Sequence, residues 1–196
     1  MDPAAVAAPS AAAAPVVEAG RWMLVARGAA LHALDREGGL SRIIPGTDLA
    51  GSRRSEAESL HHLPQRRSVL VAWPGLGEWW EVSLDPDAPP VFDGYVHDHR
   101  MGEAIARPGL LTPRRILLPG AWTRVGYLPP GAAWVGGLQG DAVVVVQLDV
   151  RRAIARFDLP GADLAASRVA DGIWLVPHAA GTARIDTRRW VELQPR

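Results

Sequence analysis

Short apolar stretches recur along this chain and alternate with turn residues, which predicts strands rather than helices. Typical examples are 68–75 (SVLVAWPG) and 141–149 (DAVVVVQLD), which are rich in β-branched and aromatic residues. Such side chains pack well on a pleated sheet. The 20 Gly and 17 Pro of the chain suit the many turns of an all-β protein. We therefore expect an all-β fold.

One three-strand phrase occurs four times, and each copy has an Asp at the end of its middle strand. An Asp carboxylate can accept backbone N–H groups one or two residues on and so shape a tight turn. The four Asp residues are Asp35, Asp85, Asp149 and Asp186, at spacings of 50, 64 and 37 residues. First strands are expected at 21–28, 68–75, 132–140 and 172–181, second strands at 29–35, 78–85, 141–149 and 182–186, and third strands at 40–46, 86–94, 153–161 and 189–194.

These spacings favour a β-propeller of about four blades over a β-sandwich, because propeller blades run to about 40–50 residues and a sandwich seldom repeats one phrase so closely. Four blades rarely close a ring alone, so half of a larger propeller is the expectation. Its open edges would need a second copy or a second propeller half. Residues 20–196 form the expected partial propeller, with an inserted loop at 93–115.

The first 19 residues are rich in Ala and Pro and are expected to be a disordered tail. They lack the basic start of a secretory signal, since Asp2 stands there. No apolar run approaches the length needed to span a bilayer. The net charge is zero, which argues against nucleic acid as a partner. The absence of Cys excludes disulfides and thiolate metal sites.

Eight Trp residues are many for a chain of 196. Trp22, Trp73, Trp134 and Trp174 occupy nearly the same place in each copy, which predicts packing between blades. Trp79 and Trp80 are adjacent and should face opposite sides of one strand, so only one of them is expected in the core. The segment 136–141 (GGLQGD) is expected to be a hairpin turn.

Three segments resemble a known family: 79–109 (WWEVSLDPDAPPVFDGYVHDHRMGEAIARPG), 147–161 (QLDVRRAIARFDLPG) and 183–193 (ARIDTRRWVEL). They are similar to the haem d1-binding propellers of cytochrome cd1-type nitrite reductases, and closer still to the related proteins of haem d1 biogenesis. The stretch 93–103 is the part of these segments that is specific to the family. The resemblance covers roughly residues 20–196.

The resemblance implies an eight-bladed propeller that holds haem d1 in its mouth, in the periplasm, for nitrite reduction or for dehydrogenation of the cofactor's precursor during denitrification. This chain would supply about half of that ring. It departs from the family where an iron ligand is expected, because neither 16–21 (VVEAGR) nor 160–164 (PGADL) contains His. Without a signal sequence, a cytoplasmic location stays open.

His97 and His99 are the candidate iron ligands, since two residues of spacing on an extended segment lets both point one way. Arg100, Arg114 and Arg115 are the candidate contacts to the cofactor, because arginine forks bind carboxylates and haem d1 is rich in them. The alternative is a solvated loop whose arginines, Arg107 included, pair with neighbouring acids.

The sequence suggests structural positions for the other histidines. His61 and His62 precede a first strand and are expected in a surface turn, although a position at the mouth is the alternative. His178 is expected in a turn and His32 on an outer strand face. No nucleophile elbow, phosphate loop or zinc signature occurs.

Two functions therefore compete. One is a tetrapyrrole protein of haem d1 type, for which enzymatic activity rests on resemblance only. The other is a non-catalytic propeller interaction module or truncated remnant, favoured by the missing His and the half-length ring. A hydrolase is a distant third.

Overall fold

The structure is a computed structural model that describes residues 14–92, 106–118, 120 and 123–194. Four antiparallel sheets of four strands each dominate this part of the chain. The first sheet comprises β1 (Val16–Ala19), β2 (Trp22–Ala26), β3 (Ala30–Asp35) and β4 (Leu40–Pro45), and the second comprises β5 (Ser59–Leu63), β6 (Ser68–Trp73), β7 (Glu78–Ser83) and β10 (Pro113–Leu117). The third comprises β11 (Arg124–Tyr127), β12 (Trp134–Gln139), β13 (Ala142–Gln147) and β14 (Arg152–Asp158), and the fourth comprises β15 (Arg168–Ala170), β16 (Ile173–His178), β17 (Gly181–Asp186) and β18 (Val191–Glu192).

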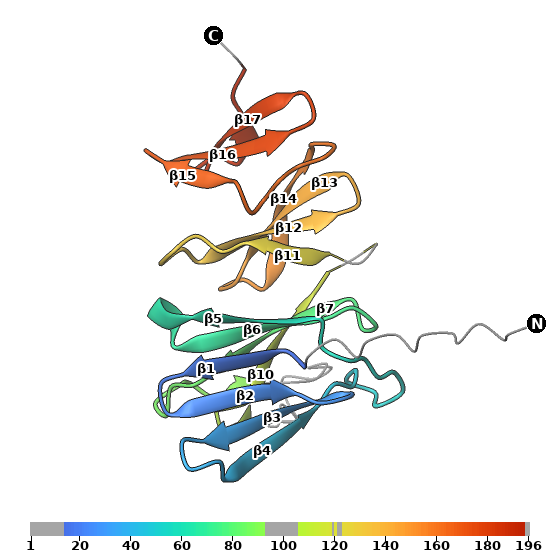
Figure 1. Ribbon diagram of the computed structural model, residues 1–196, viewed down its shortest axis with the longest axis vertical. Helices are drawn as coiled ribbons and strands as arrows, with labels where there is room; N and C mark the ends of the chain where they lie inside the picture. The colour runs from blue at the N-terminus through green and yellow to red at the C-terminus, as the bar shows by residue number, and fades with distance from the viewer. Residues whose placement is uncertain (1–13, 93–105, 119, 121–122, 195–196) are drawn as a thin grey trace, which may run out of the picture.

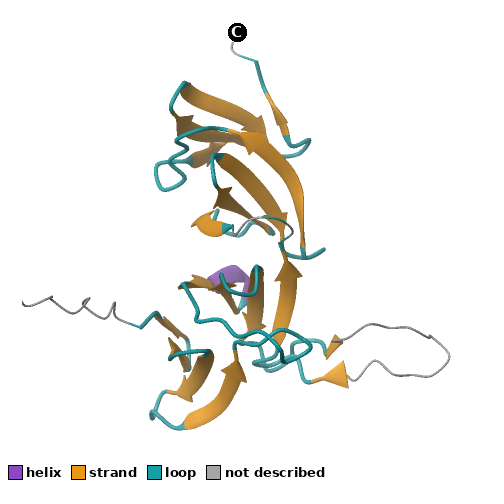
Figure 2. Ribbon diagram, turned by 90° about the vertical axis from the view of Figure 1, so that its right-hand side faces the viewer, coloured by secondary structure: helices purple, strands orange, loops and turns teal. Residues whose placement is uncertain are grey.

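In each sheet the spatial order of the strands follows their order in the chain. The four sheets succeed one another along the molecule, from the first sheet near one end to the fourth at the other (Figure 1). A short two-stranded pair, β8 (Val91–Phe92) with β9 (Ala106–Arg107), projects from the second sheet (Figure 2).

Both faces of the middle sheets are buried, because each middle sheet lies between two others. Along β6, Val69 and Val71 pack against the first sheet, whereas Leu70 and Ala72 pack against the third. Strand β13 repeats this arrangement one sheet further on: its even-numbered valines pack toward the second sheet and its odd-numbered valines toward the fourth. Three successive cores therefore join four sheets, which is the radial stacking of propeller blades. The expected four-bladed β-propeller architecture is confirmed, and we call the sheets blades 1 to 4.

The prediction that only one of Trp79 and Trp80 is in the core is wrong. They do face opposite sides of β7, but both are fully buried: Trp80 packs in the core with blade 1 and Trp79 in the core with blade 3. The prediction assumed a sheet with one solvated face. A blade between two neighbours has none.

Gly136 and Gly137 lie within β12, and the predicted hairpin turn begins only at Gly140. A Cβ on Gly137 would lie 2.8 Å from the Trp79 ring, and one on Gly136 would lie 2.6 Å from the Trp174 ring. The absence of a side chain thus leaves room for the Trp79 ring of blade 2 at Gly137 and for the Trp174 ring of blade 4 at Gly136. This close approach is a physical reason for Gly inside a strand.

The turn after each predicted middle strand, which is β3, β7, β13 or β17 in the structure, is shaped as predicted, but the repeated position is not always an Asp. Asp35, Ser83, Gln147 and Asp186 each end a strand and accept a hydrogen bond from the backbone N–H two residues on, at 2.8–3.2 Å. The expected anchors Asp85 and Asp149 lie two residues later in their blades, where Asp85 does accept the N–H of Asp87 at 2.9 Å, as predicted. Ser and Gln can serve because the turn requires only a side-chain oxygen.

Two boundaries differ from the expected ones. The tail expected over 1–19 contains β1, which pairs with β2 along its whole length. In blade 2, the outer strand beside β7 is β10 and not the Pro-rich 86–94, while β6 pairs with the other side of β7. Prolines at 86, 89 and 90 provide no N–H for a strand ladder. The connection between β7 and β10 therefore runs from residue 84 to 112. The inserted loop thus ends before β10 rather than at residue 115.

The repeated tryptophans do pack between blades, although not all at one position. Trp22 and Trp134 begin the second strands of their blades, Trp174 is one residue further in, and Trp73 ends its strand. Trp22, Trp73 and Trp174 are buried, and Trp134 contacts Trp174 with ring centroids 5.1 Å apart.

Candidate functional site

A cavity of about 300 Å³ opens where the long connection of blade 2 leaves and rejoins its sheet. Its polar lining comes from the turn before β6, the start of β6, β7, β10 and the start of the long connection, which also supplies apolar residues. The lining residues that could contact a ligand through polar groups are Gln65, Arg66, Ser68, Glu81, Ser83, Asp85 and Arg114.

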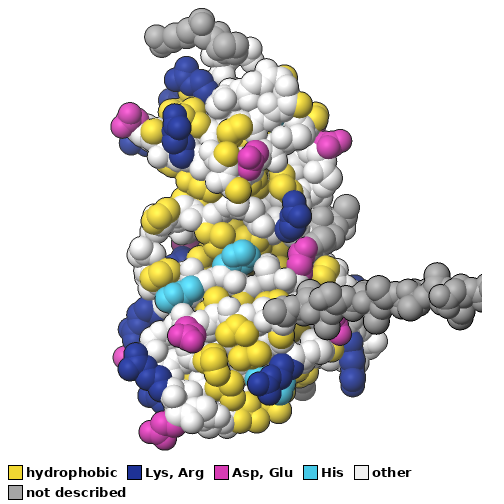
Figure 3. Space-filling view, in the orientation of Figure 1, with side chains coloured by type: hydrophobic (Ala, Val, Ile, Leu, Met, Phe, Trp, Pro, Cys, Tyr) yellow, Lys and Arg dark blue, Asp and Glu magenta, His cyan; other side chains and the backbone are white. Residues whose placement is uncertain are grey.

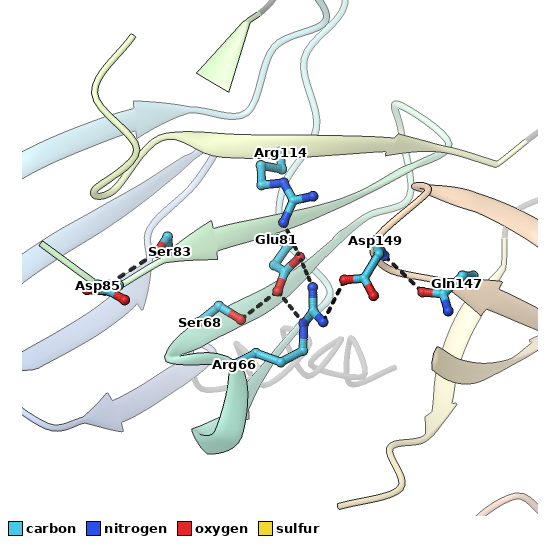
Figure 4. Close-up of polar contacts among 8 residues, drawn as sticks. All are labelled: Arg66, Ser68, Glu81, Ser83, Asp85, Arg114, Gln147 and Asp149. Carbon is cyan, nitrogen blue, oxygen red and sulfur yellow. Dashed lines mark hydrogen bonds and ion pairs between the residues drawn. The ribbon is translucent and has the colours of Figure 1, made fainter. Parts of the chain in front are cut away.

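The buried carboxylate of Glu81 is the centre of this site (Figure 4). Its side chain is 4% exposed. Arg66 donates to both carboxylate oxygens, at 2.7 and 3.1 Å, and the Ser68 hydroxyl donates at 2.8 Å. Arg114 from the neighbouring strand approaches at 3.4 Å. A carboxylate with so many donors is held as an anion in a fixed position.

Local sequence explains this geometry. Glu81 occupies the face of β7 that points toward blade 3, opposite Leu70 on β6 and Arg114 on β10. Arg66 lies in the 3-10 turn η1 (Pro64–Arg66), which ends at Arg67 with a left-handed φ of 48°. That turn directs the Arg66 side chain back over β6 and β7.

Arg66 also joins two blades. Its second guanidinium nitrogen lies 2.9 Å from the carboxylate of Asp149, in the turn of blade 3 that follows β13. The hydrogen bonds that Arg66 donates to Glu81 raise its pKa above the ordinary value, and the charge of Glu81 and the contact with Asp149 add to this effect, while burial opposes it. The neighbouring pair between Arg67 and Asp85, at 2.9 Å, lies at the rim of the same cavity.

Arg114 is the cation best placed to contact a ligand. Its side chain is one-third exposed and its contact with Glu81 is long, so most of its five N–H donors face the cavity or solvent. The site can therefore take an anionic group such as a carboxylate, held by Arg114 and by polar groups at the rim.

The structure does not bring all the predicted site residues together. Arg115 points to the opposite face of β10, where its guanidinium lies 4.2 Å from the Trp80 ring and 3.1 Å from Glu78, and donates to the Thr47 carbonyl at 2.9 Å. It borders a second cavity of about 350 Å³, between blades 1 and 2.

His97, His99 and Arg100 lie outside the described residues, so their roles stay predictions. Arg107 lies in β9, next to that uncharacterised stretch. Within the residues that the structure describes, no three His, Asp or Glu side chains gather as a metal site would need.

Sequence reasoning missed Arg66 and Glu81. The available signal was a Glu inside the apolar run 78–83 (EWWEVS), because a buried acid requires a partner. The partner itself could not be found, since it comes from a turn fifteen residues earlier.

His61 and His62 lie in β5 rather than in a turn. His61 points to the same face of blade 2 as Leu70 and contacts the Ser59 hydroxyl at 3.0 Å, whereas His62 is exposed. His178 ends β16, so it too belongs to a strand. His32 lies in β3, as expected for a strand residue.

Burial lowers the pKa of His61 below its ordinary value of 6.5. The unfolded chain therefore binds the proton more readily than the folded one, and stability should fall as the pH drops through 6.5 and below. We expect His61→Gln to flatten this dependence in urea unfolding between about pH 7.5 and 5. The matched variant His62→Gln should retain it. Equal slopes for the wild type and His61→Gln would contradict the prediction.

The fold defines the chain as part of a β-propeller. No family model matches the sequence, and no curated protein matches it. Among solved structures the chain is similar to NirN, a dihydro-haem d1 dehydrogenase solved in complex with DHE, at 23% identity and a TM-score of 0.65 over 92% of this chain and 36% of that one.

Two further likenesses are more distant. Apo AztD from Citrobacter koseri matches at 10% identity and a TM-score of 0.56, over 93% of this chain and 46% of that one. A putative 6-phosphogluconolactonase from Bacteroides fragilis matches at 12% identity and a TM-score of 0.50, over 91% and 54%. The chain thus spans about one-third to one-half of the structures it resembles, and these likenesses show the propeller fold.

No helix in the described part of the chain is long and apolar enough to cross a membrane.

Proposed function

We propose that this chain is part of a propeller that binds a tetrapyrrole of the haem d1 type, in nitrite reduction or in cofactor biogenesis. The observation that carries the proposal is the likeness to NirN along 92% of the chain, at about twice the sequence identity of the other neighbours. The 79–109 stretch, which resembles the haem d1 family, supports it as well. On the same kinship we assign the protein to the periplasm and to denitrification.

The cavity beside Glu81 gives the proposal a chemical basis. It lies at the base of the connection that carries His97 and His99, and Arg114 offers donors to a carboxylate there. We assign the iron ligand to His97 or His99 and the cofactor carboxylates to Arg100 and Arg114. Arg115 already donates to Glu78 and to the Thr47 carbonyl. It could contact the cofactor only if those hydrogen bonds broke.

The test is an absorption titration of the purified protein with haem d1. We expect a saturable shift of the cofactor's bands, and a shift that His97→Ala or His99→Ala alters in position because an axial ligand is lost. Arg114→Ala should weaken binding about tenfold without moving the bands, as expected for loss of one charge-assisted contact.

Arg188→Ala is the matched control, because this arginine lies in the last turn of blade 4, far from the cavity. Spectra that stay those of free haem d1 at every protein concentration would overturn the proposal. Binding that His97→Ala, His99→Ala and Arg114→Ala all leave unchanged would instead overturn the residue assignments.

A further inference from the structure

The outward face of blade 1 is an apolar sheet face that is exposed along its two outer strands, whereas Val25 and Leu34 on its middle strands are buried, at 6% and 9% exposed. Register places its side chains in two rows across β1 to β4, one row beginning at Val16 and the other at Glu18. Val16, Leu40 and Ile43 are each about half exposed, at 51–53%. Figure 3 shows hydrophobic side chains gathered over this first sheet, at the lower end of the molecule. The apolar members of the face are Val16, Met23, Val25, Leu34, Leu40 and Ile43.

Blade 4 has the complementary open face at the other end of the chain. The residues of β16 that alternate with Trp174 and Val176 point away from blade 3. Ile173 and Leu175 are apolar members of this face, and Leu175 is flanked across the sheet by Arg168 and Arg184. The face of blade 4 is therefore apolar, with a row of two arginines and one acid, Asp186, across from Ile173. On the blade 1 face Glu18 is the acid, and His32 lies in the other row between Val25 and Ile43.

These two faces cannot meet within one molecule, because blades 1 and 4 lie at opposite ends (Figure 1). Yet each resembles one side of the three interfaces already formed between blades, in which alternate residues of adjacent sheets interdigitate. Repeating that interface between two chains requires blade 4 of one copy on blade 1 of the other. If a two-fold axis relates the two copies, the contact forms twice, and both outward faces of each copy are covered.

We infer that two copies of this chain close an eight-bladed ring, through blade 4 of each copy packed on blade 1 of its partner. The opposite charges of Glu18 and the pair Arg168 and Arg184 favour this head-to-tail contact over blade 1 on blade 1. The inference rests on the fold and not on tetrapyrrole binding, so the two proposals can fail separately.

Light scattering during size-exclusion chromatography tests the inference. We expect the wild type at twice the 21.0 kDa chain mass. Ile43→Asp disables the blade 1 face and Leu175→Asp disables the blade 4 face, so each variant alone should be a monomer. Val150→Asp, at an exposed apolar residue in the turn after β13 and off both faces, should remain a dimer.

The mixture of the two monomeric variants is the decisive measurement. Ile43→Asp keeps an intact blade 4 face and Leu175→Asp keeps an intact blade 1 face, so together they can make one native contact and should recover a dimer. A blade 1 to blade 1 dimer would instead survive Leu175→Asp. Circular dichroism checks the fold of each variant, and the exposed Arg184→Glu replaces Leu175→Asp if that variant does not fold.

A wild-type monomer at every concentration would overturn the inference, and so would a dimer that only blade 1 variants disrupt or an open series of larger assemblies. Because no cofactor is present in these measurements, a failed haem d1 titration leaves their outcome unaffected.

Discussion

Trp79→Ala and Trp80→Ala are each expected to lower the free energy of unfolding by about 3–5 kcal/mol, the usual effect of truncating a buried Trp. Trp79 fills the core between blades 2 and 3 and donates its indole N–H to the Thr123 carbonyl at 2.9 Å. Trp80 fills the core between blades 1 and 2 and donates to Glu78 at 2.6 Å. Urea unfolding at one fixed protein concentration measures both effects.

Phe92→Ala is the control, because that ring is 59% exposed and its truncation should change stability by less than about 0.5 kcal/mol. The comparison separates two architectures. A sheet with a single buried face would make one of the adjacent tryptophans costly to remove and the other nearly neutral. That outcome would contradict the stacking of blade 2 between two neighbours.

Glu81→Leu is expected to destabilise the protein by about 3–5 kcal/mol, since it leaves the mostly buried Arg66 guanidinium without its main partner. The double variant Glu81→Leu with Arg66→Met should be less destabilised than Glu81→Leu alone, because no uncompensated charge remains. Urea unfolding compares the two variants with the wild type.

Asp158→Asn is the matched control for loss of a carboxylate. Asp158 lies 3.9 Å from Arg156, and both side chains are more than half exposed, so its loss should have an effect below about 0.5 kcal/mol. If Glu81→Leu proved as mild as Asp158→Asn, Glu81 would not anchor the site as described.

Much of the fold could be predicted from the sequence because strand patterns are local. Runs such as 142–147 identify a fully buried strand without reference to its neighbours. The burial of both Trp79 and Trp80 could not be predicted in this way, since it depends on a blade lying on each side. The same holds for Gly136 and Gly137, whose reason is a tryptophan from either adjacent blade.

The candidate site was predicted less well than the fold. Arg114 was found because it follows a loop rich in His and Arg, but its nearest acid, Glu81, is 33 residues earlier. Arg114 and Arg115 looked equivalent in sequence, yet the alternation of a strand sends them to opposite faces and hence to two different cavities. The turn anchors were misplaced in two blades because Ser83 and Gln147 replace Asp without loss of the hydrogen bond.

The stacking of four blades is the claim on which the sites and the ring depend, and nuclear Overhauser contacts from two tryptophan rings test it most directly. The structure predicts contacts from the Trp79 ring to the Gly137 Hα protons and from the Trp174 ring to the Gly136 Hα protons, one on each face of β12. Rings that contact only residues of their own sheets, or that both reach one face of β12, would contradict it.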